Sequence, residues 1–577
     1  MCRFLVLFAA QAVLAQQPAF NLSSLDPILE RTLSLFTPGA SLLITVEGQT
    51  VYRKTAGVFD TAKPVPIASA SKWLAAATIL TLVDDRTLSL DTRVSQYLPQ
   101  FSQDKASITI RQLLSHTSGL VSDSPCLVSA SVSMASCVGE IAAEPLRFPA
   151  GSKFAYGNAS LQVAGHLAER VTGKSWNTLF WERLGTPLKF TCTRLDGIGS
   201  LESPIVANGV VSCADDYTRF LQMIVGGGVY GGRRILSTAS IAEMSADQTR
   251  GVEIAETLYS SFAQLDPQLP LLRYGLGVWR ERVDSSSRAL EIGSQGAFGF
   301  SPWVDFQRNL TGVLAVASSQ EAIMQAYLDM KDVVRRTVPA WPDRSMLTAN
   351  GASFVIEPVA PGTIFSLFGP AIGPASERTL RLDSATQVST QLDGLRVLVG
   401  DRPAPLIYAG WGQISAVIPF ELEGRSSAVV QLEQNGIRGP LTLIAIATAS
   451  PGIFTLASNG RGQAAALNQD GSVNGPARPA VRGSILVLYA TGLGPLQPPI
   501  STGSVPSGAA ISRLPVQVLI GGQQAEVLYA GVAPGSIAGV YQINVRIPQA
   551  APTGTEIPVI LQAAAASSAA LATAAIR

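Results

Sequence analysis

The stretch PVPIASASKWLAAATILTLV, residues 64–83, carries both a structural and a chemical signal. Prolines occupy its first and third positions. The mostly apolar run from Trp73 to Val83 then predicts a helix that begins after the prolines. Ser69 and Lys72 fall at or near the N-terminus of that helix, and because they are three positions apart they share one face. The sequence therefore predicts a serine and a lysine side by side at the start of a buried helix.

This pair has the chemistry of a nucleophile and its base. A serine hydroxyl is a weak nucleophile until a base removes its proton. Lys72 can do this only as a neutral amine, so its pKa must fall from about 10.4 to near 7, which corresponds to roughly 4 to 5 kcal/mol. Burial and the positive end of a helix both act in that direction, and free N–H groups there can hold an oxyanion. We therefore predict Ser69 as the nucleophile and Lys72 as the base.

The Ser-x-x-Lys spacing alone does not identify the pair, because it occurs a second time. Ser102-Gln103-Asp104-Lys105 lies in a polar stretch that no apolar helix follows, so we expect a solvated loop there. Sequence context therefore separates the two copies.

Tyr156-Gly157-Asn158 is a second candidate element. It is the only Tyr-x-Asn among the twelve tyrosines, and it lies in an expected loop before a helix over residues 161–171. The Tyr156 hydroxyl could relay a proton beside Lys72, and Asn158 could hold Lys72 or a substrate amide. The alternative is an ordinary turn, because Gly and Asn tolerate unusual backbone angles.

The segments around these motifs predict one sheet with an inserted helical lobe. Asn21 to Leu35 is expected to be helical, and Ala40–Glu47 with Thr50–Gly57 to form a hairpin. Further strands are expected over residues 274–282, 290–293, 300–305 and 310–318, followed by a helix over 321–336. Strands at both ends with helices between them favour a single sheet whose ends meet.

The composition changes near residue 345. All eight lysines precede it, whereas short runs of Gly, Pro, Ala and Val with turn signals follow it, which predicts an all-β region. Residues 397–400 and 408–410 recur as residues 518–521 and 529–531, an offset of 121 positions. The sequence therefore predicts two related β modules in tandem.

The bulk composition excludes several classes of function. With 47% apolar and 14% charged residues the chain is not disordered, and 577 residues should form about three domains. The net charge of +1 gives no bulk attraction to nucleic acid or to an anionic membrane. The two histidines, His116 and His166, are isolated, so we expect no metal site and no cofactor.

The first residues predict an export signal. Arg3 precedes a short apolar run, Phe4–Leu14, and cleavage is expected after Ala15. The run is too short to span a bilayer, which takes roughly 20 apolar residues. A buried first helix is the alternative.

Residues 557–576 are alanine-rich but interrupted by polar residues, and we expect closing strands there. The mature chain is therefore predicted to be secreted, periplasmic or extracellular, with no membrane span.

Four cysteines would remain after cleavage: Cys126, Cys137, Cys192 and Cys213. An even number in an exported chain indicates disulfides, with three possible pairings. We favour neighbour pairing, Cys126 with Cys137 and Cys192 with Cys213. Four buried free thiols are the alternative.

The order of these motifs resembles the β-lactamase-related serine hydrolases, a family that spans class C β-lactamases, D-alanyl-D-alanine carboxypeptidases, D-aminopeptidases and some esterases. The matching stretches are residues 67–72 (IASASK), 113–120 (LLSHTSGL), 149–151 (PAG), 154–158 (FAYGN), 171–173 (VTG), 209–212 (GVVS), 215–220 and 274–277 (YGLG). The resemblance covers roughly residues 20 to 340. It implies a bacterial protein with an α/β serine β-lactamase-like catalytic domain, an antiparallel sheet flanked by helices plus a helical lobe.

The resemblance also implies catalytic roles. Ser69 would form the acyl-enzyme, and Lys72 and Tyr156 would share acid and base duty. Asn158 would contact Lys72 or the substrate. His116 falls in a stretch that is structural in the family, so we expect no Ser-His-Asp triad.

The third motif of the family is a basic residue or histidine, a small residue and a glycine. It matches Ser294, Gln295 and Gly296, which would contact substrate, and the N–H groups of Ser69 and Ala297 would form the oxyanion hole. Ser294 brings no cation to a substrate carboxylate, so a charge-assisted hydrogen bond of about 1.5 to 3 kcal/mol is missing. The bulkier Gln295 is expected to narrow the cleft.

We therefore expect a serine hydrolase of the esterase or D-amino-acid peptidase-like type, which acts on small-molecule or peptide esters or amides. Uncharged substrates are expected to be preferred, with weak β-lactamase activity at most. A hydrolase fold that has lost its activity and serves binding or adhesion is the alternative, because the third motif is altered.

The tail resembles a C-terminal β module of exported soil-bacterial proteins, through residues 450–455 (SPGIFT), 462–468 (GQAAALN), 488–494 (LYATGLG) and 541–545 (YQINV). That resemblance establishes no function and names no partner; binding, spacing or surface attachment is the expectation. The expected layout is a signal peptide over residues 1–15, a hydrolase domain over 16–346, and Ig-like β-sandwich modules over 347–449 and 450–577.

Overall fold

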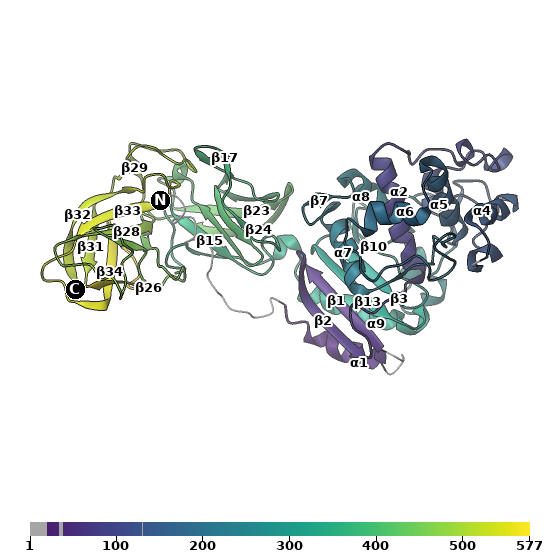
Figure 1. Cartoon of the computed structure of the whole chain (residues 1–577), viewed down its shortest axis with the longest axis horizontal. Coiled ribbons are helices and arrows are strands. Elements are labelled where there is room, and N and C mark those ends of the chain that lie inside the picture. The colour runs from purple at the N-terminus through teal and green to yellow at the C-terminus, as the bar shows by residue number, and fades with distance from the viewer. Residues whose placement is uncertain (1–19, 34–38, 130) are drawn as a thin grey trace. The chain divides into compact units, whose positions relative to one another are not determined.

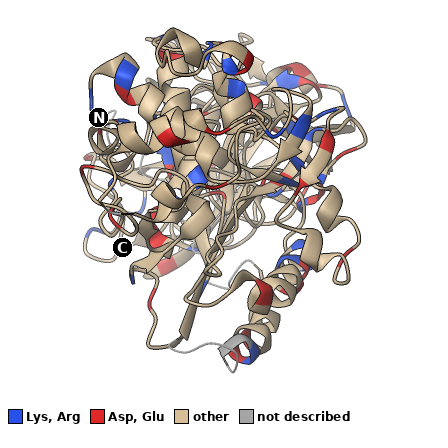
Figure 2. Cartoon of the chain, turned by 90° about the vertical axis from the view of Figure 1, so that its right-hand side faces the viewer, with Lys and Arg blue, Asp and Glu red and all other residues tan. Residues whose placement is uncertain are grey.

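The computed structural model describes residues 20–33, 39–129 and 131–577 (Figure 1). The expected signal peptide and the last positions of the helix expected to reach Leu35 lie outside the described residues. The chain forms two compact units, Phe20–Pro339 and Ala340–Arg577, and each has its own hydrophobic core. Basic and acidic residues are interspersed in the view of Figure 2, in keeping with the net charge of +1. None of the described helices is long and apolar enough to cross a membrane.

The first unit is built on a seven-stranded antiparallel sheet in the order β2-β1-β13-β12-β11-β10-β9. Its strands are β1 (Gly39–Val46), β2 (Gln49–Gly57), β9 (Arg273–Tyr274), β10 (Trp279–Val283), β11 (Ala289–Gly293), β12 (Ser301–Asp305) and β13 (Leu310–Val316). The expected hairpin is formed by β1 and β2. Because β1 also pairs with β13, with Ala40 opposite Val316, the two ends of the unit meet in one sheet, as predicted.

Helices cover both faces of this sheet. Tyr217 of α7 (Ala214–Val225) shares a core with Val304 of β12. Trp303 of β12 instead meets Tyr327 of α9 (Gln320–Thr337), with ring centroids 5.6 Å apart. Successive strand residues point to opposite faces, so α7 and α9 lie on opposite sides of the sheet. The helix α1 (Asp26–Leu33) packs beside α9.

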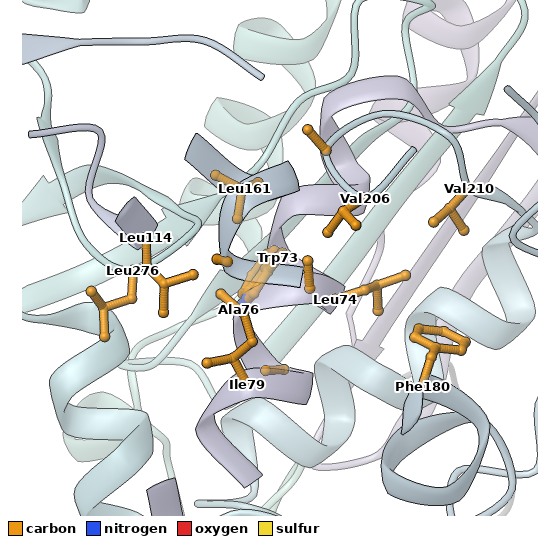
Figure 3. Close-up of a cluster of buried hydrophobic side chains, with 14 of the residues drawn as sticks. Trp73, Leu74, Ala76, Ile79, Leu114, Leu161, Phe180, Val206, Val210 and Leu276 are labelled. Atoms are coloured by element: carbon orange, nitrogen blue, oxygen red, sulfur yellow. The ribbon is translucent and has the colours of Figure 1, made fainter. Parts of the chain in front are cut away.

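The helical lobe is inserted between β2 and β9. Its central helix, α2 (Ser71–Asp84), is buried on every side, since all residues from Ser71 to Leu82 are buried. Figure 3 shows Trp73 and Ile79 of α2 among apolar side chains of the lobe. The helices α5 (Ala159–Thr172), α6 (Trp176–Phe180) and α8 (Thr238–Ser245) contact α2, and α3 (Ile110–Leu114) and α4 (Met134–Ala143) contact α5. This packing fixes the residues at the N-terminus of α2.

Two disulfides lie in the lobe. Cys126 is joined to Cys137 and Cys192 to Cys213, which are the neighbour pairs that the sequence favoured.

The second unit contains strands and short 3-10 turns. The repeat in the sequence is also a repeat of the strand order. Three strands of the first copy, β15 (Ile364–Phe368), β19 (Leu395–Val399) and β21 (Leu406–Gly410), have counterparts in the second copy. The counterparts are β28 (Ile485–Thr491), β31 (Val516–Ile520) and β32 (Gln523–Val532). Other strands include β14 (Leu347–Asn350), β22 (Gln413–Val417), β23 (Ser427–Gln434), β24 (Ile437–Ala445), β33 (Tyr541–Arg546), β34 (Gly554–Ala563) and β36 (Ala572–Ile576). The two repeats share a core in which Phe454 and Tyr489 join Ile364 and Val417. The Ig-like character of each module stays a prediction.

Candidate active site

Ser69 lies in a tight turn at the start of the central helix of the lobe. The short strand β3 (Val65–Pro66) pairs with β5 (Val211–Ser212), the 3-10 turn η3 (Ala68–Ala70) follows, and α2 then begins. Ala68 has a φ of 44°, in the left-handed region that residues other than glycine seldom adopt. Ser69 is half-buried, whereas Ala68 and Ala70 on either side are buried, so the turn leaves the serine accessible.

The Lys72 side chain is fully buried and its Nζ atom faces Ser69. Nζ lies 3.0 Å from Ser69 Oγ, 2.7 Å from Asn158 Oδ1 and 3.3 Å from the carbonyl oxygen of Ala207. Burial lowers the pKa of Lys72 to about 7, and the Asp123 carboxylate opposes that shift. A neutral amine is therefore available beside the serine hydroxyl near neutral pH.

Tyr156 follows the short strand β4 (Lys153–Ala155), and its ring centroid lies 4.9 Å from Lys72 Nζ. Its hydroxyl is buried and has no hydrogen-bond partner among the described residues. Burial raises the pKa of Tyr156, while the nearby Ser69 hydroxyl acts in the opposite direction. The tyrosine therefore stays protonated at neutral pH, which suits a proton donor better than a base.

Asn158 is the residue that precedes α5, and both ends of its amide are bonded. Oδ1 accepts the bond from Lys72, and Nδ2 donates to Asp123 Oδ1 over 2.5 Å. The Asn158 backbone N–H also donates to the Ser122 carbonyl over 2.6 Å. Asp123 is not among the residues predicted from the sequence; the signal for it is its position three residues after the LLSHTSGL stretch.

The third motif lies against the Ser69 turn. The Ser294 hydroxyl is buried and donates to the Ser69 carbonyl over 3.2 Å. A Cβ atom at Gly296 would come within 2.1 Å of the Ile67 carbonyl oxygen, so only glycine allows this approach. Ala297 is exposed, and the backbone N–H groups of Ser69 and Ala297 donate to no other described residue. Two free N–H groups therefore stand on adjoining turns.

Gln295 does not occupy the cleft. Its side chain is fully buried and donates to Glu281 and, over 2.8 Å, to the Tyr327 hydroxyl, while it accepts from the Tyr259 hydroxyl. The expectation that Gln295 narrows the cleft is therefore wrong, because its amide is satisfied on the side that faces α9. Lys331 of α9 pairs with Glu281 as well, and a cavity of about 380 Å³ is lined by Tyr259, Glu281, Tyr327 and Lys331 among others.

His116 is buried beside the site without taking part in its hydrogen bonds. Its ring lies 4.8 Å from the Tyr156 ring, and neither ring nitrogen has a hydrogen-bond partner among the described residues. Burial and the neighbouring Lys72 hold the pKa of His116 well below its usual value, so the ring is neutral. His166 is also buried and contacts Glu169 at 3.1 Å on α5.

The second Ser-x-x-Lys copy lies elsewhere, around the 3-10 turn η5 (Gln103–Lys105). Ser102, Gln103 and Asp104 are exposed, as expected of a loop, but only 10% of the Lys105 side chain is exposed. The prediction of a solvated loop is therefore wrong for that lysine.

Cys192, Cys213 and Asp216 form the one group of possible metal ligands in the described part of the chain. Both sulfurs are joined in a disulfide, and the Asp216 carboxylate accepts backbone N–H groups of residues 191–193.

Comparison with known proteins gives a consistent result. The family model Beta-lactamase matches residues 34–329. Penicillin-binding protein 4 of Amycolatopsis lactamdurans is 28% identical over 253 residues, which is 36% of this chain and 65% of that protein. Protein flp of Staphylococcus aureus (strain NCTC 8325 / PS 47) is 30% identical over 185 residues, 29% of this chain and 37% of that protein. The chain thus spans less than two thirds of these relatives.

A solved structure is similar to more than half of the chain. The crystal structure of a candidate beta-lactamase from Bacteroides dorei DSM 17855 is 31% identical and has a TM-score of 0.50. It covers 55% of this chain and 99% of that protein.

Proposed function

Because the chain belongs to the beta-lactamase family, we propose that it is a serine hydrolase that cleaves esters or amides through an acyl-enzyme on Ser69. One observation carries this proposal: Lys72 Nζ lies 3.0 Å from Ser69 Oγ, and burial lowers the pKa of this lysine to about 7. General-base activation of a serine needs both this contact and a neutral base.

The first half-reaction would form the acyl-enzyme. Neutral Lys72 takes the Ser69 proton while Oγ attacks the carbonyl carbon, and the N–H groups of Ser69 and Ala297 stabilise the resulting oxyanion. The oxyanion collapses, the bond to the alcohol or amine breaks, and the proton passes from Lys72 to that leaving group by way of the Tyr156 hydroxyl. A water molecule then loses a proton to the same base and attacks the acyl carbon, and the acid is released as Ser69 recovers its proton.

We propose that the preferred substrates carry no carboxylate. The Ser294 hydroxyl is engaged with the Ser69 carbonyl, and Ser294 offers no charge for an anionic substrate. Carboxylate-bearing β-lactams should therefore be poor substrates.

We also propose that the protein works outside the cytoplasm. The predicted export signal and the two disulfides both support this, because disulfides persist in oxidising compartments.

A binding protein on an impaired hydrolase fold is the second candidate, and the altered third motif favours it. Steady-state hydrolysis of p-nitrophenyl butanoate by the full chain separates the two. We expect turnover that Ser69→Ala lowers by more than about a thousandfold, whereas Ser102→Ala, in the exposed second copy of the motif, leaves it unchanged. No hydrolysis above background would favour the binding protein.

A further inference from the structure

Asp123 is connected to the nucleophile through an unbroken series of hydrogen bonds. Its Oδ1 atom accepts from Asn158 Nδ2 over 2.5 Å, Asn158 Oδ1 accepts from Lys72 over 2.7 Å, and Lys72 Nζ lies 3.0 Å from Ser69 Oγ. Asp123 is exposed, so it lies at the solvent end of these hydrogen-bonded residues.

The charge of Asp123 is not neutralised by the protein. No Lys, Arg or His side chain lies within 4.0 Å of its carboxylate in the described ranges, and Oδ2 has no hydrogen-bond partner there. Arg147, which bonds the adjacent Ser122, is already paired with Glu256 at 2.6 Å. One oxygen of Asp123 is thus held by Asn158 and the other is free.

The rest of the site supplies no compensating positive charge. A pKa of about 7 leaves most of Lys72 uncharged above neutral pH, and Ser294 is neutral at the position where the family motif has a basic residue or histidine. The field of Asp123 also reaches the centre of the site, because it raises the pKa values of both Lys72 and Tyr156. Asp123, two hydrogen-bonded residues away from Ser69, is therefore a negative charge that no ion pair among the described residues balances.

We propose that Asp123 binds a protonated amine on the substrate, so that the preferred substrates are esters or amides whose acyl group carries an ammonium near the scissile carbonyl. The inference rests on the proposed function of Ser69. The free Oδ2 can accept a charge-assisted hydrogen bond from an ammonium. A single free carboxylate oxygen suits such a point charge, whereas Ca²⁺ would need six to eight oxygen ligands.

Two isosteric esters test the proposal on the full chain: the p-nitrophenyl esters of β-alanine and of butanoic acid, which differ by an ammonium in place of a methyl group. Their ratio of kcat/KM, corrected for spontaneous hydrolysis, is measured at about pH 7.5, where the amine is protonated. Asp123→Asn should lower that ratio about tenfold while it keeps an acceptor for Asn158. Added salt should lower the ratio for the wild type and not for this variant.

Asp104→Asn is the matched control, because Asp104 is an exposed carboxylate on η5 that bonds no residue of the site. It should leave the ratio unchanged. An equal loss for both esters in Asp123→Asn would overturn the proposal, because Asp123 would then act only by orienting Asn158. The proposal would also be overturned if Asp123→Asn hydrolysed both esters with the same ratio of kcat/KM as the wild type. Failure of the proposed function would look different, since the wild type would then hydrolyse neither ester.

Discussion

Lys72 and Lys331 are both buried in the same unit, yet their pKa values move in opposite directions. Burial lowers the pKa of Lys72 to about 7, and no carboxylate lies within 4.0 Å of its Nζ atom among the described residues. Burial also acts to lower the pKa of Lys331, but Glu281 and Glu291 raise it above its ordinary value. Of these two buried lysines, Lys72 is therefore the one that can be a neutral base near pH 7.

The pH dependence of ester hydrolysis follows from this difference. The base form of Lys72 is the unprotonated amine, so kcat/KM should rise with pH through a midpoint near 7 and then level off. The Asp123 charge raises the pKa of Lys72, so Asp123→Asn should move that midpoint to lower pH. The profile of kcat/KM for p-nitrophenyl butanoate from about pH 5 to 9 measures both.

Lys72→Arg should lower kcat/KM at least about a hundredfold at every pH, because a guanidinium is not deprotonated in a protein. Lys105→Arg is the matched control in the other Ser-x-x-Lys copy and should keep both the rate and the midpoint. Equal losses in the two variants would remove Lys72 from the mechanism.

Gln295 should act as a positioning residue for the turn that carries the Ala297 N–H group, one of the two proposed oxyanion donors. Gln295→Met keeps the length of the side chain but removes the bonds to Tyr259, Glu281 and Tyr327. We expect kcat for neutral esters to fall about tenfold with little change in KM, because the Ala297 N–H would be less well aimed. Gln268→Met, at an exposed glutamine, is the control. A lower Tm with an unchanged kcat would show that the network only stabilises the fold.

The sequence predicted the local relationships well. Ser69 and Lys72 face each other because three positions along the start of a helix place side chains on one face. The strand patterns at the two ends of the unit predicted the pairing of β1 with β13. Asp123 could not be found in this way, since its role depends on a contact with Asn158, 35 positions away. The direction of the Gln295 side chain could not be predicted from the sequence either, because its partners Tyr259, Glu281 and Tyr327 come from three separate segments.

A cation at position 294 should change the substrate preference. Ser294→Lys should raise the ratio of kcat/KM for a carboxylate-bearing β-lactam to that for a neutral ester by about tenfold, because it adds a charge-assisted hydrogen bond. Ser294 is buried, so Ser294→Met is needed to separate added bulk from added charge. If the two variants behave alike, Ser294 is not at an anion-binding position.

The catalytic unit should fold and work without the β modules. The apolar core around α2 draws all its residues from positions 43 to 315, so a chain that ends at Pro339 keeps that core intact. We expect a soluble protein whose kcat/KM for p-nitrophenyl butanoate is within about threefold of the full chain. Insoluble or unfolded protein by circular dichroism would show that residues 340–577 complete the fold.

Intact-mass analysis after reaction with a fluorophosphonate shows whether Ser69 is the nucleophile. We expect the addition of one phosphonyl group per chain, located on Ser69 by peptide mapping. The addition should be slower in Lys72→Arg, because the serine then lacks its base. Labelling should be absent in Ser69→Ala and unchanged in Ser102→Ala. A folded wild-type chain that gains no mass, or a label that maps to another residue, would show that Ser69 is not the nucleophile.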